Sequence, residues 1–239
     1  MNILLLGATG ATGKLVLKEL INNDYNISIV VRNKEKIEAD ILNNKNIEII
    51  ESNILDMSEN ELKNLIKTSD VFISCLGHNI SFKGIFGEPK KLVSDSLKKI
   101  CKLVERENIK PIKFILMNTS GNINHDENEK VSFFHKVLLF IIRTLVPPHL
   151  DNEMAANYLR LDIGQKNDLI QWVVVRPDSL INEDKVSKYS LYSSPTRSAL
   201  LDAGQTSRIN VASFMCELIK NNSLWNTWKG KMPVIYNIN

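Results

Sequence analysis

Short runs of hydrophobic residues recur along the first three quarters of the chain. Six of them predict β-strands, at residues 2–6, 27–31, 47–50, 71–74, 112–117 and 170–175. The runs are almost unbroken rather than alternating, which is typical of strands buried on both faces of a parallel sheet. Segments with helical period accompany them, over residues 14–21, 58–67, 91–108, 152–166 and 211–220. This alternation predicts an α/β fold of the Rossmann type, with a doubly wound parallel sheet.

Other segments predict loops and one unusually apolar helix. A glycine-containing loop is expected near residues 84–87 and a polar loop over 122–130. Residues 131–146 predict an apolar helix, which we expect Pro147-Pro148 to end. Its membrane-like part, residues 137–146, is interrupted by Arg143 and is well below the ~20 residues that cross a membrane. We interpret it as a buried or interface helix.

Composition excludes several classes of partner. The chain has 239 residues, of which 44% are hydrophobic and 24% charged, and its net charge of +3 is too small to argue for nucleic acid or a membrane surface. Its three cysteines, Cys75, Cys101 and Cys216, are widely separated, which favours a reducing cytoplasm and no disulfide framework. The histidines have no partners at metal-ligand spacing, so we expect no metal. A monomer or homodimer is expected.

The first strand leads into the most informative motif. Gly7, Gly10 and Gly13 follow the strand at three-residue spacing and precede a helix. In such a turn the first glycine permits the tight bend, the second lets a diphosphate approach, and the third lets the helix pack on the strand. Backbone N–H groups and the helix dipole then attract an anion. The motif predicts a dinucleotide site, and the alternative is a tight turn without a ligand.

This prediction sets the expected organisation of the whole chain. We expect a single NAD(P)-binding domain over residues 1–239. Its dinucleotide-binding core spans residues 1–180. From about residue 178 the pattern loosens into polar loops and short helices, so residues 181–239 are expected to form a small lobe facing the substrate.

Arg32 ends the second strand, about 20 residues after the glycine motif, where NAD-binding proteins place an acidic residue for the ribose 2′-hydroxyl. A guanidinium there suits a 2′-phosphate instead, and Lys34 or Lys36 can assist. We therefore expect NADP as the cofactor. The alternative is a solvated surface arginine.

Three further strand ends carry candidate contacts. Asn53, after the third strand, offers an amide to an adenine edge or simply forms a turn. Cys75-Leu76-Gly77 follows the fourth strand, where small residues let a ribose and diphosphate pass. His78 can contact substrate or cofactor, or play a structural role.

Together these residues resemble the atypical short-chain dehydrogenases/reductases. The resemblance is to the NAD(P)H-binding branch with biliverdin and flavin reductases and NmrA-like redox-sensing regulators. It is close over about residues 1–180 and looser up to 207–212. The residues that carry it are Gly7 to Gly13, Arg32, Asn53 with Asp56, Cys75 to Gly77, Asn118 to Ser120, and Val173 to Pro177.

The resemblance implies particular site residues. The implied active-site hydroxyl is Thr119 or Ser120, and Asn53 stands where the family has an aspartate. The segment after the sixth strand is the one that usually covers the nicotinamide. The expected cofactor contacts are Gly7, Thr9, Gly10, Ala11, Thr12, Gly13, Arg32, Asn53, Ile54, Cys75, Leu76, Gly77, Pro177, Ser179 and Leu180.

The proton-transfer pair of the conventional enzymes is missing. They carry Tyr-x-x-x-Lys on a helix, where the lysine lowers the pKa of the tyrosine. Here Tyr158 is followed four residues later by Asp162, and another register places Met154 and Tyr158 at the two positions. Tyr158 can still donate a hydrogen bond to a substrate, or it is an ordinary half-buried tyrosine.

The sequence thus predicts an NADP-dependent oxidoreductase. It would transfer hydride from the nicotinamide to a small, conjugated or flavin-like substrate, with Thr119, Ser120 and Tyr158 as candidate catalytic residues. A second hypothesis is an NADP(H)-sensing regulatory protein without turnover, for which the apolar residues 133–146 would be a contact surface. A nucleotide-sugar epimerase or dehydratase ranks last, because it needs the missing pair.

Overall fold

The fold is described from a computed structural model. The structure describes residues 1–78, 86–127, 129, 138, 141, 143, 145–199 and 201–238. The glycine-containing loop expected near 84–87 falls partly outside the described residues. Most of the apolar helix expected over 131–146 does so too, as does His135.

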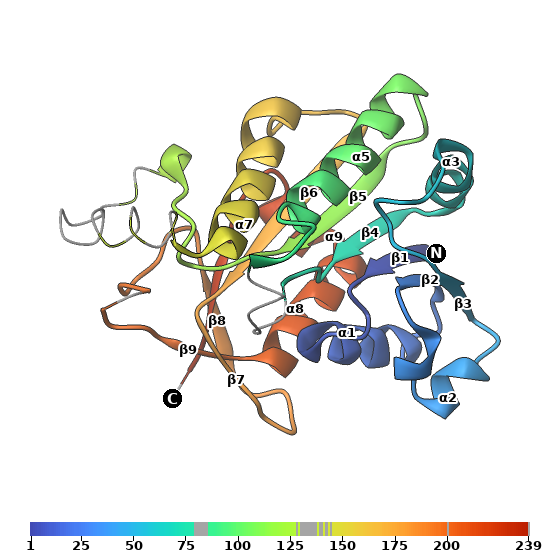
Figure 1. The fold of residues 1–239 in the computed structure, drawn as a ribbon. Helices are drawn as coiled ribbons and strands as arrows, with labels where there is room; N and C mark the ends of the chain where they lie inside the picture. Colours follow the sequence, from blue (N-terminus) through green and yellow to red (C-terminus); the bar gives the residue numbers. More distant parts are fainter. Residues whose placement is uncertain are drawn as a thin grey trace.

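A twisted eight-stranded sheet forms the centre of the described chain, with strand order β3-β2-β1-β4-β5-β6-β10-β8 (Figure 1). All neighbouring strands pair in parallel except β8, which runs antiparallel to β10. The predicted α/β fold of the Rossmann type is confirmed. The strands are β1 (Asn2–Leu6), β2 (Asn26–Val31), β3 (Ile47–Glu51), β4 (Val71–Ser74), β5 (Ile112–Met117), β6 (Ile170–Pro177), β8 (Tyr189–Tyr192) and β10 (Val234–Asn237).

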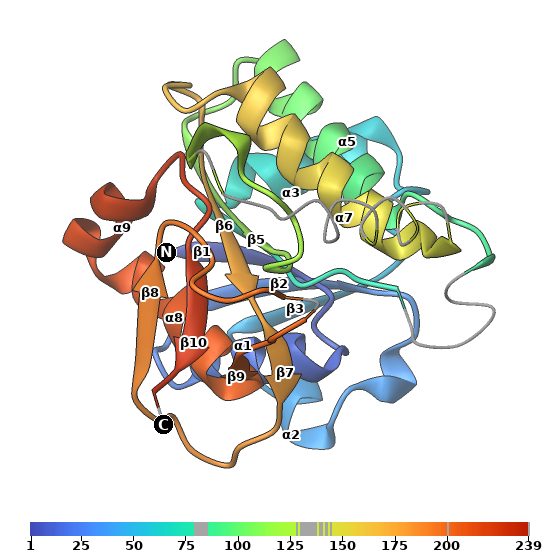
Figure 2. The ribbon, with the colours of Figure 1, turned by 90° about the vertical axis from the view of Figure 1, so that its left-hand side faces the viewer.

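Helices cover both faces of this sheet (Figures 1 and 2). One face carries α1 (Ala11–Ile21), α8 (Arg208–Lys220) and α9 (Asn222–Trp228), and the other carries α3 (Glu59–Thr68), α5 (Leu92–Arg106) and α7 (Pro147–Asn157). Each face buries its own hydrophobic cluster, which explains why the central strands β1 and β4 are almost entirely apolar and buried. The short elements are η1 (Lys34–Lys36), α2 (Ala39–Leu42), η2 (His125–Glu127), η3 (Tyr158–Ile163), β7 (Ser179–Ile181) and β9 (Gln205–Ser207).

The helix α7 begins at the prolines that were expected to end a helix. Pro147 and Pro148 occupy its first positions, where a missing N–H costs nothing and the fixed φ of proline suits the helix. The helical segment continues into a π-helical turn, η3, which ends at Gly164 with φ +77°. The helix expected at 152–166 therefore starts earlier, at Pro147, and its last part, Tyr158–Ile163, is π-helical rather than α-helical.

Much of residues 181–239, expected as a small lobe of the same domain that faces the substrate, belongs to the main layers. β10 lies between β6 and β8 in the sheet, and α8 packs on α1. Trp225 of α9 is 2% exposed. The parallel pair β7–β9 lies outside the large sheet and continues from the end of β6.

A buried arginine ties the end of β6 to three other segments. Arg176 is fully buried and donates to the carbonyl oxygens of Met232 (2.7 Å), Asn122 (2.8 Å) and Ser193 (3.0 Å). It also donates to Glu129 Oε1 at 2.7 Å, and the Glu129 side chain is only 5% exposed. The positive charge is thus paired where water cannot reach it, and it holds the loops after β5 and β8 against β6.

Glu129→Gln should destabilise the protein strongly, because it leaves the Arg176 charge buried without a counter-charge. We expect the free energy of unfolding to fall by about 3–5 kcal/mol, measured by urea denaturation. Asp202→Asn, which breaks the exposed pair with Arg197, is the control and should leave the unfolding midpoint unchanged. Equal midpoints for both variants would contradict the assigned role of the buried pair.

Candidate functional site

The turn between β1 and α1 has room only for glycine at two of its positions. Gly7 has φ +79°, and a Cβ there would lie 2.5 Å from the carbonyl oxygen of Cys75. A Cβ on Gly13 would lie 2.0 Å from the carbonyl oxygen of Gly7. Both positions exclude a side chain because backbone packs directly on backbone, so α1 sits tightly on the end of β1.

The N-terminus of α1 is left open to an anion. Its N-cap is Gly10, which supplies no side-chain cap, and no acidic residue stands in the first turn of the helix. A Cβ on Gly10 would meet only the carbonyl oxygen of Gly7, at 3.3 Å. Ala11 and Thr12 form the first turn of this helix. The N–H groups of the first turn, which have no partner within the helix, and the positive end of the helix dipole therefore both face the space in front of α1.

A cleft of about 160 Å³ opens beside this turn, along the carboxyl ends of the central strands. The structure brings together the predicted residues Gly7, Thr9, Gly10, Arg32, Asn53, Ile54, Cys75, Leu76 and Gly77 in its lining. Lys36 also lines it. Sequence reasoning missed the remaining lining residues, Leu6, Val30, Val31, Ser52 and Leu92.

The charge of the cleft is one-sided. Arg32 and Lys36 line it, and the described lining contains no carboxylate. Arg32 is exposed, and within the described chain its guanidinium forms no ion pair. Of the two nearest acids in sequence, Glu35 accepts a hydrogen bond from the Asn33 side chain and does not line the cleft, and Glu38 is engaged by Lys14 and Lys18. An anionic group in the cleft would meet two free cations.

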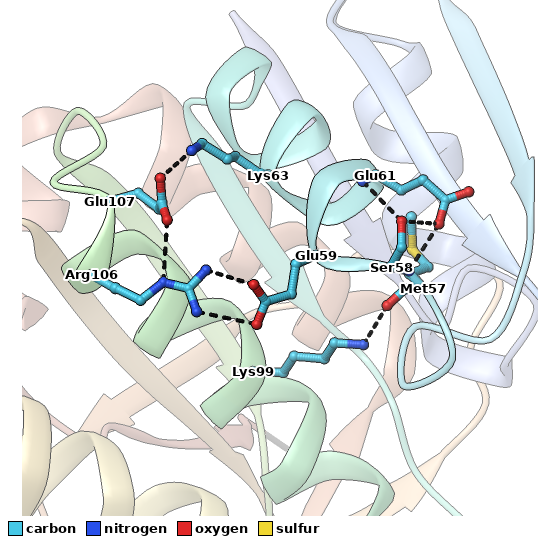
Figure 3. Close-up of polar contacts among 8 residues, drawn as sticks. All are labelled: Met57, Ser58, Glu59, Glu61, Lys63, Lys99, Arg106 and Glu107. Atoms are coloured by element: carbon cyan, nitrogen blue, oxygen red, sulfur yellow. Dashed lines mark hydrogen bonds and ion pairs between the residues drawn. The ribbon is translucent and has the colours of Figure 1, made fainter.

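The loop after β3 forms one wall of the cleft and is fixed in two ways. The Asn53 side chain accepts a hydrogen bond from Leu55 N and donates to Asp56, so the amide shapes the turn while lining the cleft. From behind, Lys99 of α5 donates to the carbonyl oxygens of Ile54 (3.3 Å), Leu55 (2.7 Å) and Met57 (2.7 Å). Figure 3 shows Lys99 reaching the loop beside the surface network of Glu59, Arg106, Glu107 and Lys63.

Cys75 supports the turn and is not a reactive thiol. Burial raises its pKa to about 12, so the thiol stays protonated at neutral pH. Its backbone packs under Gly7, as described above. Gly77 has nothing within 4 Å of where a Cβ would lie, so it borders open space.

The two candidate hydroxyls after β5 occupy different surroundings. Thr119 Oγ1 accepts a hydrogen bond from Gly121 N at 3.2 Å. Ser120 is buried near Asp178, whose pKa is raised by burial and held down in part by Ser120 and Gly204. Within the described residues the Ser120 hydroxyl makes no well-aligned hydrogen bond. Thr119 is thus the half-buried hydroxyl and Ser120 the enclosed one.

The segment after β6 lies beside these hydroxyls and outside the lining of the cleft. Ser120 N donates to the carbonyl oxygen of Pro177 at 2.9 Å. Ser179 N donates to Gly204 at 3.0 Å, and Leu180 continues into the β7–β9 pair. Their expected contact with a cofactor stays a prediction.

Tyr158 lies in the hydrophobic core and not in the cleft. It is 8% exposed, and Lys98 of α5 lies 5.6 Å above its ring. Burial raises the pKa of Tyr158 well above its ordinary value, and Cys101 adds to this effect. Lys98 and Cys101 stand about 9–14 Å along α5 from Leu92, its cleft-lining first residue. The structure therefore does not bring Tyr158 together with Thr119.

A buried acid holds His78 at the edge of the cleft. His78 Nε2 lies 2.9 Å from Asp151 Oδ2, and Asp151 is 1% exposed. The same carboxylate accepts hydrogen bonds from Val93 N (2.8 Å) and Ser94 N (2.9 Å) in the first turn of α5. Burial works to raise the pKa of Asp151, but these hydrogen bonds lower it overall, so the carboxylate stays ionised. It joins α7 to α5 and to the loop after β4.

Sequence reasoning missed His149. A Cβ on Gly121 would lie 3.4 Å from His149 Cε1 and 3.6 Å from Thr119 Oγ1, so these two side chains flank the same point. The only signal in the sequence is that His149 and Glu153 are four residues apart, the separation of the missing tyrosine and lysine.

The comparison with protein families agrees with this geometry. The family model described as NAD(P)H-binding matches residues 7–222. The chain belongs to this NAD(P)H-binding family. The match begins at the first glycine of the turn and includes every strand from β2 to β9. The predicted membership of an NAD(P)H-binding family is confirmed.

Curated relatives and solved structures extend the comparison. The NAD(P)H-binding chain is 24% identical over 236 residues to averufin oxidase A of Aspergillus flavus, which covers 92% of this chain and 77% of that protein. It is similar to a short-chain dehydrogenase/reductase from Veillonella parvula in complex with NADP, with 18% identity, TM-score 0.71, and 99% and 94% of the two chains covered. It is also similar to ChuY, an anaerobillin reductase from Escherichia coli, with 16% identity, TM-score 0.68, and 100% and 98% covered. The described helices include none long and apolar enough to cross a membrane.

Lys99→Met should weaken binding of adenosine 2′-monophosphate about 10-fold, because three carbonyl groups lose their donor and the wall of the cleft loosens. Titration calorimetry measures this, with nicotinamide mononucleotide as a ligand that should bind unchanged. Lys63→Met is the matched control, since it removes a cation from the same α3–α5 surface without touching the wall. A similar loss in both variants would show that Lys99 acts on stability alone.

Proposed function

We propose that this chain is an NADP(H)-dependent reductase that acts on a small, conjugated or flavin-like substrate. The observation that carries the proposal is the cleft itself. A glycine turn that excludes side chains faces an uncapped helix N-terminus, and two cations without a carboxylate stand beside it.

The residues present fit a dinucleotide with a 2′-phosphate. Gly10, Ala11 and Thr12 would hold the diphosphate through backbone N–H groups. Arg32 and Lys36 would hold the 2′-phosphate, and Asn53 and Ile54 would border the adenine. When bound, the cofactor would supply a hydride to an acceptor at the ends of β5 and β6.

The named relatives support a reductase. ChuY is named as a reductase, and the divinyl chlorophyllide a 8-vinyl-reductase of Cucumis sativus is 34% identical over 83 residues, 31% of this chain and 20% of that protein. Reduction of a conjugated or flavin-like acceptor is also the chemistry that least needs a tyrosine–lysine pair. The burial of Tyr158 favours such an acceptor over a simple ketone.

The competing function is an NADP(H) sensor, which the missing pair favours. Steady-state oxidation of NADPH with FMN and with a quinone separates the two functions. We expect turnover with at least one acceptor. The decrease in the absorbance of reduced nicotinamide measures it. Tight NADPH binding without turnover of either acceptor would favour the sensor.

Arg32→Ala should weaken NADP⁺ binding by about 10–100-fold and leave NAD⁺ binding nearly unchanged, because a charge-assisted contact to the 2′-phosphate is lost. Titration calorimetry with both cofactors measures the difference. Lys34→Ala serves as the control, since Lys34 is a neighbouring exposed cation that does not line the cleft. Equal affinity of the unmodified protein for NAD⁺ and NADP⁺ would overturn the role of Arg32 and leave the dinucleotide site intact.

A further inference from the structure

The proposed reductase lacks the tyrosine that donates a proton in conventional enzymes, so another side chain at the strand ends must donate it. Such a donor would stand beside the half-buried hydroxyl after β5, Thr119. The Asn118 side chain next to it donates to the carbonyl oxygen of Asn152 at 2.8 Å, which fixes α7 over this strand end. The first half of α7 therefore carries the side chains that can meet Thr119.

His149 is the side chain in that half that reaches the same point. It stands in the first turn of α7, and its Cε1 lies within 3.4 Å of the place that a Cβ on Gly121 would fill. Thr119 Oγ1 borders the same place at 3.6 Å. The absence of a side chain on Gly121 thus leaves space between a hydroxyl and an imidazole.

Glu153 lies one helical turn further along α7, on the same side as His149. It accepts a hydrogen bond from Arg143 Nε at 2.7 Å. His149 and Glu153 thus have the four-residue spacing of a tyrosine–lysine pair, at an earlier place on the helix than Tyr158.

Resting on the proposed function, we propose that His149 is the proton donor of this active site and that Thr119 holds the acceptor's reacting oxygen beside it. The acceptor class is a conjugated carbonyl compound such as a quinone. The hydride brings its electron pair to the carbonyl system, and the C=O π pair moves onto oxygen. That oxygen takes a proton from the protonated His149 ring. The N–H bond breaks, and its electron pair stays on the ring nitrogen. Water later reprotonates the His149 ring.

The surroundings of His149 suit this step. Burial lowers its pKa below the ordinary value, Arg143 lowers it further, and Glu153 opposes both. A lower pKa makes the protonated ring a stronger acid, although less of it is present at neutral pH. Since the donor is the protonated form, quinone reduction should slow as pH rises through this pKa.

Three other groups are less suitable. The Ser120 hydroxyl faces Asp178, and Tyr158 lies in the core against α5. His78 is held by Asp151, which spends its other hydrogen bonds on the first turn of α5. Only His149 shares a space with Thr119 among these candidates.

The test compares two acceptors in His149→Asn. Reduction of phenanthrenequinone requires a proton on the carbonyl oxygen. FMN that has accepted a hydride at N5 can leave the site with an anionic N1, so it needs no proton from the protein. We expect kcat for the quinone to fall at least about 100-fold and to lose its pH dependence, while the FMN rate stays within about 2-fold. His149→Tyr, which restores a phenolic donor, should recover part of the quinone rate. His125→Asn is the matched control, because His125 is exposed on η2, and it should change neither rate.

Two readouts do not depend on turnover. NADPH affinity and the thermal midpoint of His149→Asn should match those of the unmodified protein. In the unmodified protein loaded with NADP⁺, added phenanthrenequinone should shift the His149 Cε1 proton resonance, which is assigned by its loss in the variant. An unmoved resonance would overturn the proposal.

The outcomes separate this inference from the proposed function. If the unmodified protein reduces neither acceptor, the proposed reductase function is wrong, and so is the proposal that His149 is the proton donor. If it reduces FMN alone, or if His149→Asn reduces the quinone at the original rate, the donor is wrong and the reductase stands. A selective loss of quinone reduction supports both.

Discussion

Backbone-on-backbone contact at the first turn determines the geometry of the candidate site. With no side chain on Gly13, α1 approaches the carbonyl of Gly7 closely enough that an added Cβ would lie 2.0 Å from it. As a result, the uncapped N-terminus of α1 faces the cleft at the carboxyl ends of the central strands. The carbonyl of Cys75, from the adjacent β4, closes on Gly7 from the other side. Two neighbouring strands and one helix are thus locked around a single peptide unit, and the cleft begins there.

The remaining walls of the cleft are held by polar contacts that leave its interior free. Lys99 holds the loop after β3 from the side of α5, and Asp151 holds the start of α5. Neither ion lines the cleft. The cations that do line it, Arg32 and Lys36, have no carboxylate beside them in the described lining. Charges that support the walls are therefore separate from charges available to a ligand.

Much of this arrangement could be predicted from the sequence, because it depends on local patterns. The strands β1 to β6 appear as runs rich in apolar residues, and the glycine spacing with Arg32 marks the start of the cleft. Contacts between distant segments could not be predicted. β8 and β10 are short, and their place in the sheet is set by the pairing of β10 with β6 and of β8 with β10 rather than by their own composition. His149 was overlooked because its significance comes from facing Thr119, which only the position of α7 reveals.

The contacts of Arg176 have a consequence for the order in which the chain can fold during synthesis. The guanidinium needs the carbonyl oxygens of Met232 and Ser193, both made after β6 itself. Until they emerge, the guanidinium can reach only Asn122 and Glu129 among these partners, and β6 is the edge strand of the sheet. The half of the molecule around β1 can assemble early, whereas the end of β6 is completed only when the segment before β10 has been made. A nascent chain would therefore form the region that we assign to the nucleotide before the region that we assign to the acceptor.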